Sequence, residues 1–448
     1  MLFRQFVDDD LGCASYLIGD EECGEAFVVD PAYEIDPYVR EAERRQVRIA
    51  GVLETHTHAD HVSGHGRLAL EHGAAVGVHP AAEPEFPFKP LEDGAELELG
   101  AAVVRVLHTP GHRPEHCCFA VSDRSRAEQP WFVLTGDTLL VGDAARPDLA
   151  VPSLEGARGL CRSLRRLLEL PDGVEVYPGH VAGSLCGAAV NSKASTTIGF
   201  ERRFNDALAL AAEDEEAFVA ESSAVSAPRP PTVDHVVALN RGVFLGRPPE
   251  LEAVADPHGA TVLDVRPPPE FAAGHCEGAI NVAVSASAFG TKAGFVLEPE
   301  ERVVLCASSN AQAILAARRL RAVGLLGLEG YLLDPPAAAR LEPVDLEELE
   351  ALIADDAVEV IDVREKSERD HGFIAGSRHI PYRLVRAWAE ELRGERPVVT
   401  ICETGSRAAI AASVLEAAGV EARPVLSGGV SAWHARGHQT VSFRRCGS

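Results

Sequence analysis

The sequence lacks the features that would place the protein in a membrane or on a nucleic acid. It contains no run of about 18 apolar residues, the length that spans a bilayer. It begins Met-Leu-Phe-Arg-Gln-Phe-Val, without the basic start and long apolar stretch of a signal peptide. Its net charge of −26 would be repelled by phosphate backbones and by anionic membranes. We therefore expect a cytoplasmic protein that binds neither nucleic acid nor membrane; the sequence leaves open whether it forms a homo-oligomer.

Cysteine and lysine are both scarce. The ten cysteines are scattered and form no Cys-x-x-Cys pair, so in a reducing compartment we expect mostly free thiols. Only four lysines stand among the 42 basic residues, a bias that indicates a GC-rich bacterial genome.

The length of 448 residues predicts about three domains. The run from Ser222 to Pro231, rich in Ser, Ala and Pro, is typical of a linker. We place the first boundary between residues 230 and 245, and predict a metal domain with its C-terminal extension and linker over residues 1–240.

An internal repeat occupies the rest of the chain. Val262–Arg266 resembles Val360–Arg364, and three further pairs of short segments follow in the same order, at offsets of 96 to 98 residues. Each copy alternates apolar runs with helical segments, which predicts two parallel α/β domains over residues 245–342 and 345–442.

Histidine is concentrated near the N-terminus, with ten of the 17 between His56 and His180. The segment Thr55–His61 reads Thr-His-Thr-His-Ala-Asp-His and follows a predicted strand. Three later turns, each after a strand, end in His112, Asp137 and His180. Imidazole and carboxylate ligands suit zinc or iron. Any one histidine could be an ordinary core or surface residue, but the four segments together predict a metal site.

These motifs resemble the metallo-β-lactamase superfamily over roughly residues 1–200. The resemblance implies an αββα sandwich with a metal site at one edge. It also implies seven candidate ligands, namely His56, His58, Asp60, His61, His112, Asp137 and His180.

Two branches of that superfamily share this ligand set. Resemblance to glyoxalase II implies a thioester hydrolase with two metals per chain, zinc among them. Resemblance to persulfide dioxygenase implies one Fe(II) per chain, held by His56, His112 and Asp137. In that case the second-site candidates His58, Asp60, His61 and His180 hold no metal. The ligand types alone do not choose between the branches.

Two features favour the dioxygenase branch. Thr135–Asp148 resembles the dioxygenase pattern in which Gly-Arg-x-Asp follows the ligand Asp, although Ala145 stands in place of the Gly. Arg146 would then bind the carboxylate of the thiol substrate; the alternative is an ion pair with Asp148 or Asp143. The C-terminal part also lacks the helical glutathione-binding extension expected of glyoxalase II.

A second candidate site is the segment Cys402–Arg407, which reads Cys-Glu-Thr-Gly-Ser-Arg. It follows an apolar strand and precedes an Ala-rich helix, so the cysteine faces a helix N-terminus that favours the thiolate. The N–H groups of the loop would cradle an anionic substrate. Arg407 adds a positive charge, and Gly405 permits the tight turn. The substrate-binding loop is predicted to comprise Glu403, Thr404, Gly405 and Ser406; the alternative is a buried structural cysteine.

This loop, with its flanking segments, resembles the rhodanese active site over residues 345–442. The six-residue spacing from Cys402 to Arg407 is shorter than in related phosphatases, which favours sulfur over phosphate. In the first copy Cys306 stands at the corresponding place, but Ser309 takes the place of the glycine and Ala311 that of the arginine. We therefore expect the first copy to be degenerate.

The predicted fold class is α/β: a metallo-β-lactamase αββα sandwich followed by two rhodanese-like parallel α/β domains. The predicted function is Fe(II)-dependent oxidation of a low-molecular-weight thiol persulfide by O2 to sulfite and thiol. Cys402 would transfer sulfur between persulfide, sulfite and thiosulfate. The alternatives are a dinuclear thioester hydrolase with an appended sulfurtransferase, and rhodanese-like copies that act only as sulfur carriers or docking modules.

Overall fold

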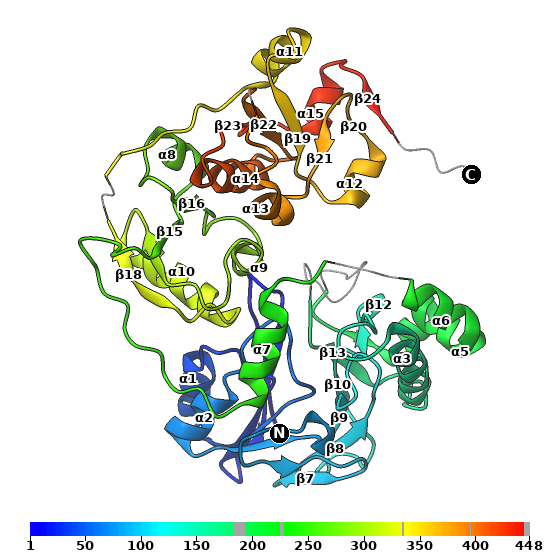
Figure 1. Cartoon of the computed structure of the whole chain (residues 1–448). Helices are drawn as coiled ribbons and strands as arrows, with labels where there is room; N and C mark the ends of the chain where they lie inside the picture. The colour runs from blue at the N-terminus through cyan, green and yellow to red at the C-terminus, as the bar shows by residue number, and fades with distance from the viewer. Residues whose placement is uncertain (182–192, 225–227, 334–335, 395, 443–448) are drawn as a thin grey trace. The chain divides into compact units, whose positions relative to one another are not determined.

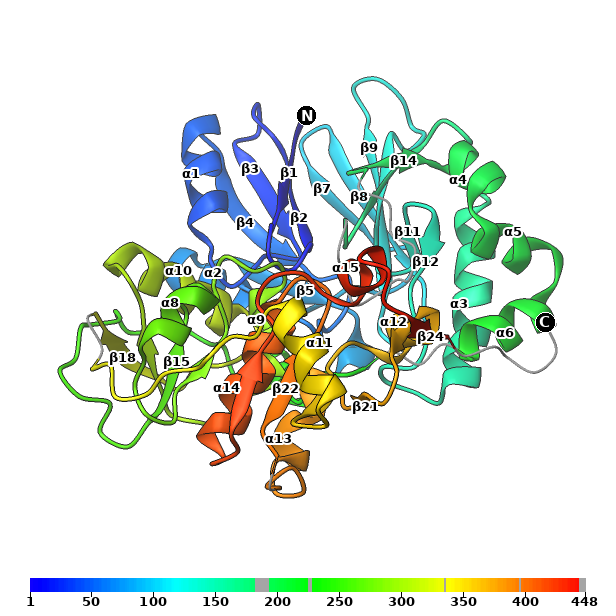
Figure 2. The ribbon, with the colours of Figure 1, turned by 90° about the horizontal axis from the view of Figure 1, so that it is seen from above.

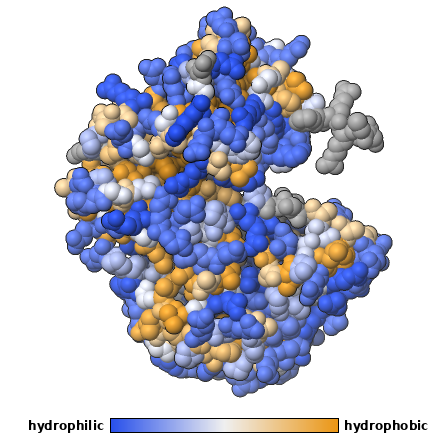
Figure 3. All heavy atoms as spheres, in the orientation of Figure 1, coloured by the Kyte–Doolittle hydropathy of each residue, from blue (hydrophilic) through white to orange (hydrophobic). Residues whose placement is uncertain are grey.

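The structure is a computed structural model that describes residues 1–181, 193–224, 228–333, 336–394 and 396–442. The chain divides into two compact units (Figure 1), one over Met1–Pro248 with Arg321–Gly324 and one over Pro249–Leu320 with Leu325–Ser448. Among the described residues, no helix is both long and apolar enough to cross a membrane. On the face shown in Figure 3, hydrophobic residues lie in separate patches among hydrophilic ones, as on ordinary globular surfaces.

Two six-stranded sheets form the centre of the first unit. The first sheet has the order β1 (Leu2–Val7), β2 (Ala14–Asp20), β3 (Glu25–Val29), β4 (Arg48–Leu53), β5 (Ala75–Val78) and β6 (Lys89–Pro90). The second has the order β14 (Thr196–Thr197), β13 (Glu175–Pro178), β10 (Phe132–Gly136), β9 (Cys117–Asp123), β8 (Ala102–His108) and β7 (Glu96–Leu99). Strands β3 to β6 are parallel, and so are β10 and β13.

The alternation of side chains along the strands produces the layers. Tyr16 and Ile18 of β2 join Phe119 of β9 and Phe132 of β10 in one buried cluster, which lies between the two sheets. Leu17, one residue out of phase, belongs instead to the cluster that packs against helices. A strand exposes successive side chains to opposite faces, so sheets with apolar residues at every position are covered on both sides.

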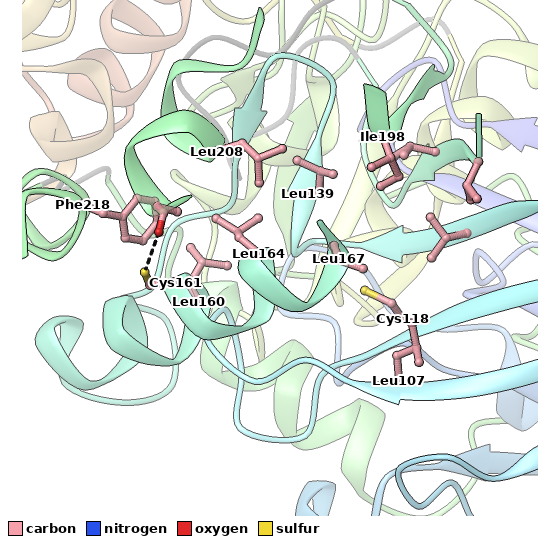
Figure 4. Packing of buried hydrophobic residues seen from close by; sticks show 14 of the residues in the cluster. Leu107, Cys118, Leu139, Leu160, Cys161, Leu164, Leu167, Ile198, Leu208 and Phe218 are labelled. Atoms are coloured by element: carbon pink, nitrogen blue, oxygen red, sulfur yellow. Dashed lines mark hydrogen bonds between the residues drawn. The ribbon is translucent and has the colours of Figure 1, made fainter. Parts of the chain in front are cut away.

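Helices cover both outer faces (Figure 2). The first sheet is covered by α1 (Asp36–Arg45) and α2 (His65–His72). The second is covered by α3 (Ser153–Leu167), α5 (Asp206–Glu213) and α6 (Glu215–Ser223), and α4 (Ile198–Phe204) directly precedes α5. Figure 4 shows Leu160 and Leu164 of α3 packed with Phe218 of α6. The apolar residues of α3 recur every three or four positions, so they form one buried stripe. The αββα sandwich predicted from the sequence is confirmed.

The predicted linker lies partly outside the described residues, at 225–227. The helix that follows it, α7 (Thr232–Arg241), still belongs to the first unit. Asn240 of α7 donates from Nδ2 to the carbonyls of His58 (3.0 Å) and His61 (2.8 Å). Its Oδ1 accepts from the Ser63 N–H at 2.8 Å. This helix therefore fixes the backbone of the histidine-rich segment.

The second unit contains two four-stranded parallel sheets with the same topology. The first has the order β16 (Ile280–Asn281), β15 (Thr261–Asp264), β17 (Val303–Cys306) and β18 (Leu328–Leu332), with helices α8 (Pro268–Ala273), α9 (Phe289–Gly294) and α10 (Asn310–Ala322). The second has the order β21 (Arg378–His379), β19 (Glu359–Asp362), β22 (Val398–Ile401) and β23 (Ala422–Pro424). Its helices are α11 (Leu346–Ala354), α12 (Lys366–His371), α13 (Val385–Trp388), α14 (Ser406–Ala417) and α15 (Val430–Ala435). A small antiparallel pair is formed by β20 (Phe373–Ile374) and β24 (Thr440–Val441). The predicted pair of parallel α/β domains is confirmed.

Candidate metal centre and persulfide loop

Three predicted ligands converge at one end of the sandwich. His56 follows β4, His112 follows β8 and Asp137 follows β10, and all three are buried. Their ligand atoms all lie within 4.8 Å of one another. Asp137 Oδ2 is 3.5 Å from His112 Nε2 and 4.0 Å from His56 Nε2. Two imidazoles and one carboxylate at these distances form a metal-ligand triad.

Hydrogen bonds behind the triad orient each ligand. His112 Nδ1 donates to the carbonyl of Arg146 at 3.0 Å, which leaves the lone pair on Nε2. Burial lowers the pKa of both His56 and His112, so both rings are neutral and able to bind a cation. Although burial raises the pKa of Asp137, its neighbour His180 holds it below the usual value. His180 Nδ1 donates to Asp137 Oδ1 at 2.7 Å.

His116, which follows the predicted ligand His112 by four residues, also belongs to this centre. Burial lowers the pKa of His116 to about 3, so its Nε2 accepts a hydrogen bond from the Asp137 N–H at 3.0 Å. It thereby fixes the turn that carries Asp137. No sequence motif pointed to His116, although it lies in the same turn as His112.

The unsatisfied polar atoms fit a bound cation. Across the described part of the chain, the buried side-chain atoms without a hydrogen-bond partner include His58 Nδ1, His61 Nε2 and Asp137 Oδ2. All three belong to predicted ligands. Buried polar atoms are almost always paired, so their concentration here indicates the place of a metal.

His58 lies beside His56, with ring centroids 4.3 Å apart, but its other contacts are different. Its Nε2 lies 3.2 Å from Glu54 Oε2 and 3.3 Å from Asp30 Oδ1. Asp30 also accepts from the N–H and the hydroxyl of Thr55, at 2.7 and 2.8 Å. These two buried carboxylates hold the histidine-rich segment from behind, and local sequence patterns did not point to them.

The remaining predicted ligands form a second group. His180 Nε2 lies 2.9 Å from Asp60 Oδ2, and His61 Nδ1 lies 3.3 Å from Asp60 Oδ1. Cys13, which belongs to no sequence motif, lies among them. The structure thus brings all seven predicted ligands to one region, in two adjoining sets.

Arg146 is buried, and its guanidinium is paired with Asp148. Its Nε and Nη2 donate to the two carboxylate oxygens of Asp148 at 2.6 and 2.7 Å. This is the ion pair considered as the alternative to substrate binding. The carbonyl of Arg146, by contrast, contacts the candidate ligand His112.

In the last domain Cys402 lies between β22 and α14, fully buried. The Gly405 N–H donates to its sulfur at 3.1 Å. Gly405 has φ 88°, and a Cβ at this position would clash with the Leu426 carbonyl oxygen. Only glycine fits this turn, as the loop pattern predicted.

Arg407 is paired with Glu368 of α12. Its Nη1 and Nη2 donate to the two carboxylate oxygens at 2.5 and 2.6 Å. Glu403 of the loop accepts from the Ser431 N–H at 3.2 Å and lies 3.6 Å from Arg364 Nη1. The loop therefore has a cation at its end, but a carboxylate from another element positions and partly neutralises it.

The comparisons with known proteins agree with the fold of both units. Residues 8–180 match the metallo-beta-lactamase superfamily, and residues 248–334 and 345–436 each match the rhodanese-like domain. The chain belongs to the metallo-beta-lactamase superfamily and carries two rhodanese-like domains, as the motifs predicted.

Among its relatives, an uncharacterized protein of Mycobacterium leprae is 33% identical over 46% of this chain and 97% of its own length. The mitochondrial persulfide dioxygenase ETHE1 of Bos taurus is 28% identical over 56% of this chain and 91% of its own. A crystal structure of a metallo-beta-lactamase from Staphylococcus aureus, 28% identical, covers 74% of this chain and 98% of its own with a TM-score of 0.67.

Proposed function

We propose that this protein is an iron-dependent persulfide dioxygenase with a rhodanese sulfurtransferase activity. The observation that carries the proposal is the buried convergence of His56, His112 and Asp137, with Asp137 Oδ2 left without a protein partner. Similarity to persulfide dioxygenases supports this substrate class. We also propose domain boundaries near residues 240 and 343.

The first reaction converts a thiol persulfide, O2 and water into thiol, hydrogen sulfite and one proton. Fe(II), when bound, supplies the O2 chemistry. The protein contributes two neutral imidazoles and one carboxylate, which leave a net positive centre that attracts an anionic persulfide. His180 holds Oδ1 of Asp137 through a 2.7 Å hydrogen bond, so Oδ2 is the oxygen left to bind the metal. For Arg146 to bind the substrate carboxylate, as the sequence pattern suggested, its pair with Asp148 would have to open.

The second reaction is sulfur transfer at Cys402. Its thiolate attacks the outer sulfur of thiosulfate, forms an S–S bond and releases sulfite; an acceptor then takes the sulfur and regenerates the thiolate. The loop N–H groups of residues 403–406 and the guanidinium of Arg407 would hold the anions.

The test of the first reaction is O2 uptake by the iron-loaded full-length protein with a synthetic thiol persulfide. We expect one O2 consumed per persulfide and about one iron per chain, with sulfite as product. His112→Ala should lose the iron and the O2 uptake together. Stoichiometric iron in that variant would contradict the assignment.

One observation favours a second candidate, a dinuclear thioester hydrolase. His58 Nδ1 is buried without a partner while the carboxylates of Asp30 and Glu54 face Nε2, the arrangement of a histidine that binds a metal through Nδ1. Under the dioxygenase proposal His58→Ala should lose less iron than His112→Ala. Equal loss, together with O2-independent release of thiol from a thioester, would favour the hydrolase.

A rhodanese-like copy that served only as a sulfur carrier or docking module would not catalyse turnover. Steady-state transfer from thiosulfate to an acceptor separates it from a sulfurtransferase. A single stoichiometric sulfur loading without turnover would favour the carrier.

A further inference from the structure

The helix that follows the Cys402 loop is buried on every side. In α14 all eight residues from Ala408 to Leu415 are buried, and eight consecutive residues of a helix point in all directions around its axis. The corresponding helix of the first copy, α10, buries one stripe, and its Ile314 and Leu315 are 51% and 38% exposed. The sheet of the last domain covers one face of α14, so another part of the chain covers the rest.

This cover comes from the first copy, whose edge strand β16 lies beside α14 (Figure 1). The Val282 N–H donates to the Asp264 carbonyl of β15, so the preceding Asn281 N–H points out of the sheet. It donates to Ser413 Oγ at 2.9 Å, and both residues are fully buried. The Ser413 hydroxyl donates in turn to the Ile410 carbonyl of its own helix at 2.8 Å. A serine of one copy thus satisfies an edge N–H of the other, which burial would otherwise leave unpaired.

His275 of the first copy makes a second contact with the same helix. It is fully buried, with Nδ1 2.8 Å from the Phe271 carbonyl oxygen and Nε2 2.8 Å from Glu416 Oε2 of α14. A carbonyl and a carboxylate both accept hydrogen bonds, so both ring nitrogens donate and the ring is positively charged. Although burial lowers the pKa of His275, the hydrogen bond from Glu416 holds it above the usual value. A hydrogen-bonded ion pair therefore joins the two copies.

Both contacts act on the helix that completes the Cys402 loop. Helix α14 begins at Ser406, directly after Gly405, whose N–H donates to the Cys402 sulfur at 3.1 Å. Arg407 lies in its first turn. A helix is stiff and rises about 1.5 Å per residue, so Ser413 lies roughly 10 Å along the axis from the first turn and controls where that turn sits.

We propose that the degenerate copy positions the sulfur-transfer site, because Ser413 and Glu416 tie α14 to it and thereby hold the Gly405 N–H against the Cys402 sulfur. Ser413 and Glu416 are positioning residues, which act through the helix rather than on the sulfur. The inference rests on the proposed sulfurtransferase function for its activity measurement, but not for the reactivity of the Cys402 thiol.

The loop of the first copy is consistent with a role that needs no substrate. Its Ser308 N–H donates to Gln312 Oε1 at 2.6 Å, and the Gln312 N–H donates to Ser309 Oγ at 3.2 Å. These two loop N–H groups are therefore paired within the loop instead of being held ready for an anion. The copy has kept the framework that contacts α14 while its loop bonds to itself.

Alkylation of Cys402 by iodoacetamide over a range of pH tests the inference in the full-length protein, with mass spectrometry of the peptide that carries Cys402. A thiolate that receives an N–H donor forms at lower pH. The double variant Ser413→Ala, Glu416→Ala should raise the pH midpoint of alkylation by roughly half to one unit. It should also lower kcat/KM for thiosulfate about 3- to 10-fold, the effect of losing one hydrogen bond. Ser413→Ala with Glu416→Gln keeps an acceptor for His275 and should change both values less.

Glu421→Ala is the matched control, because Glu421 is an exposed carboxylate shortly after α14, and it should change neither value. Circular dichroism at the assay temperature shows whether the double variant is folded; Ser413→Ala alone, with a smaller shift in the same direction, decides the matter if it is not. Lower activity with an unchanged pH midpoint would mean that the contacts only stabilise the fold, and would overturn the inference. Unchanged activity and midpoint would overturn it as well. A shifted midpoint in a protein whose wild type transfers no sulfur would refute the sulfurtransferase proposal and leave the positioning role standing.

Discussion

The two rhodanese-like copies share a scaffold and differ in their loops. In both, an Asp at the end of a central strand binds an Arg two residues later through paired hydrogen bonds, Asp264 with Arg266 and Asp362 with Arg364. In both, a buried Cys ends the neighbouring strand or follows it directly, Cys306 after the apolar part of β17 and Cys402 after β22. The topology alone therefore does not distinguish an active copy from an inactive one.

The loops that follow these cysteines provide different surroundings. Burial raises the pKa of the Cys306 thiol far above its usual value, and the negative charge of the neighbouring Asp264 raises it further. At Cys402 the Gly405 N–H donates to the sulfur, and Arg407 stands at the end of the loop. A fold can thus keep its framework while the loop changes, and the first copy has neither the glycine nor the arginine that we expect to stabilise an anion in the second.

The largest expected effect separates the two cysteines. Cys402→Ser should reduce sulfur transfer from thiosulfate to background, because an alcohol cannot form a persulfide. Cys306→Ser is the matched variant and should keep nearly full activity. Steady-state assays of both proteins measure the difference, and an inactive Cys306 variant would reverse our assignment of the copies.

The next effect is on the products of persulfide oxidation. If sulfite from the iron site accepts sulfur at Cys402, wild type should yield sulfite and thiosulfate, while Cys402→Ser yields sulfite alone. Chromatography of both anions after reaction with persulfide and O2 measures the ratio. The same ratio in the two proteins would exclude the relay and leave the dioxygenase proposal standing.

A smaller effect is expected at Arg407. Arg407→Ala removes a charge-assisted hydrogen bond to the anion, worth about 1.5–3 kcal/mol, or roughly 10- to 160-fold in kcat/KM for thiosulfate. Glu368→Gln, which leaves the arginine in place, should change kcat/KM less. If the two variants are equally impaired, Arg407 acts only through its pair with Glu368.

The smallest effect is a gain in the first copy. In a Cys402→Ser background, Ser309→Gly combined with Ala311→Arg should restore a low, measurable transfer activity at Cys306. Ser309→Gly alone should restore none, because it adds no cation. Activity that stays at background in the double variant would show that the pocket around Cys306 matters as much as its loop.

The layers of the fold and most candidate sites could be predicted from the sequence. Continuous apolar strands, the Thr55–His61 segment and the Cys402–Arg407 loop are local patterns, and local patterns place a ligand at a strand end or a cysteine before a helix. The difference between the two copies is local as well, because the first has Ala311 where the second has Arg407.

The tertiary structure alone decided which distant side chains meet those motifs. Cys13 reaches Asp60 and His180, 47 and 167 residues away, and Glu368 reaches Arg407 across 39 residues. Asp30 behind His58, and Asn240 beside the histidine-rich segment, likewise come from other elements. Such contacts depend on how strands and helices pack rather than on the period of any one element, and so no local pattern specifies them.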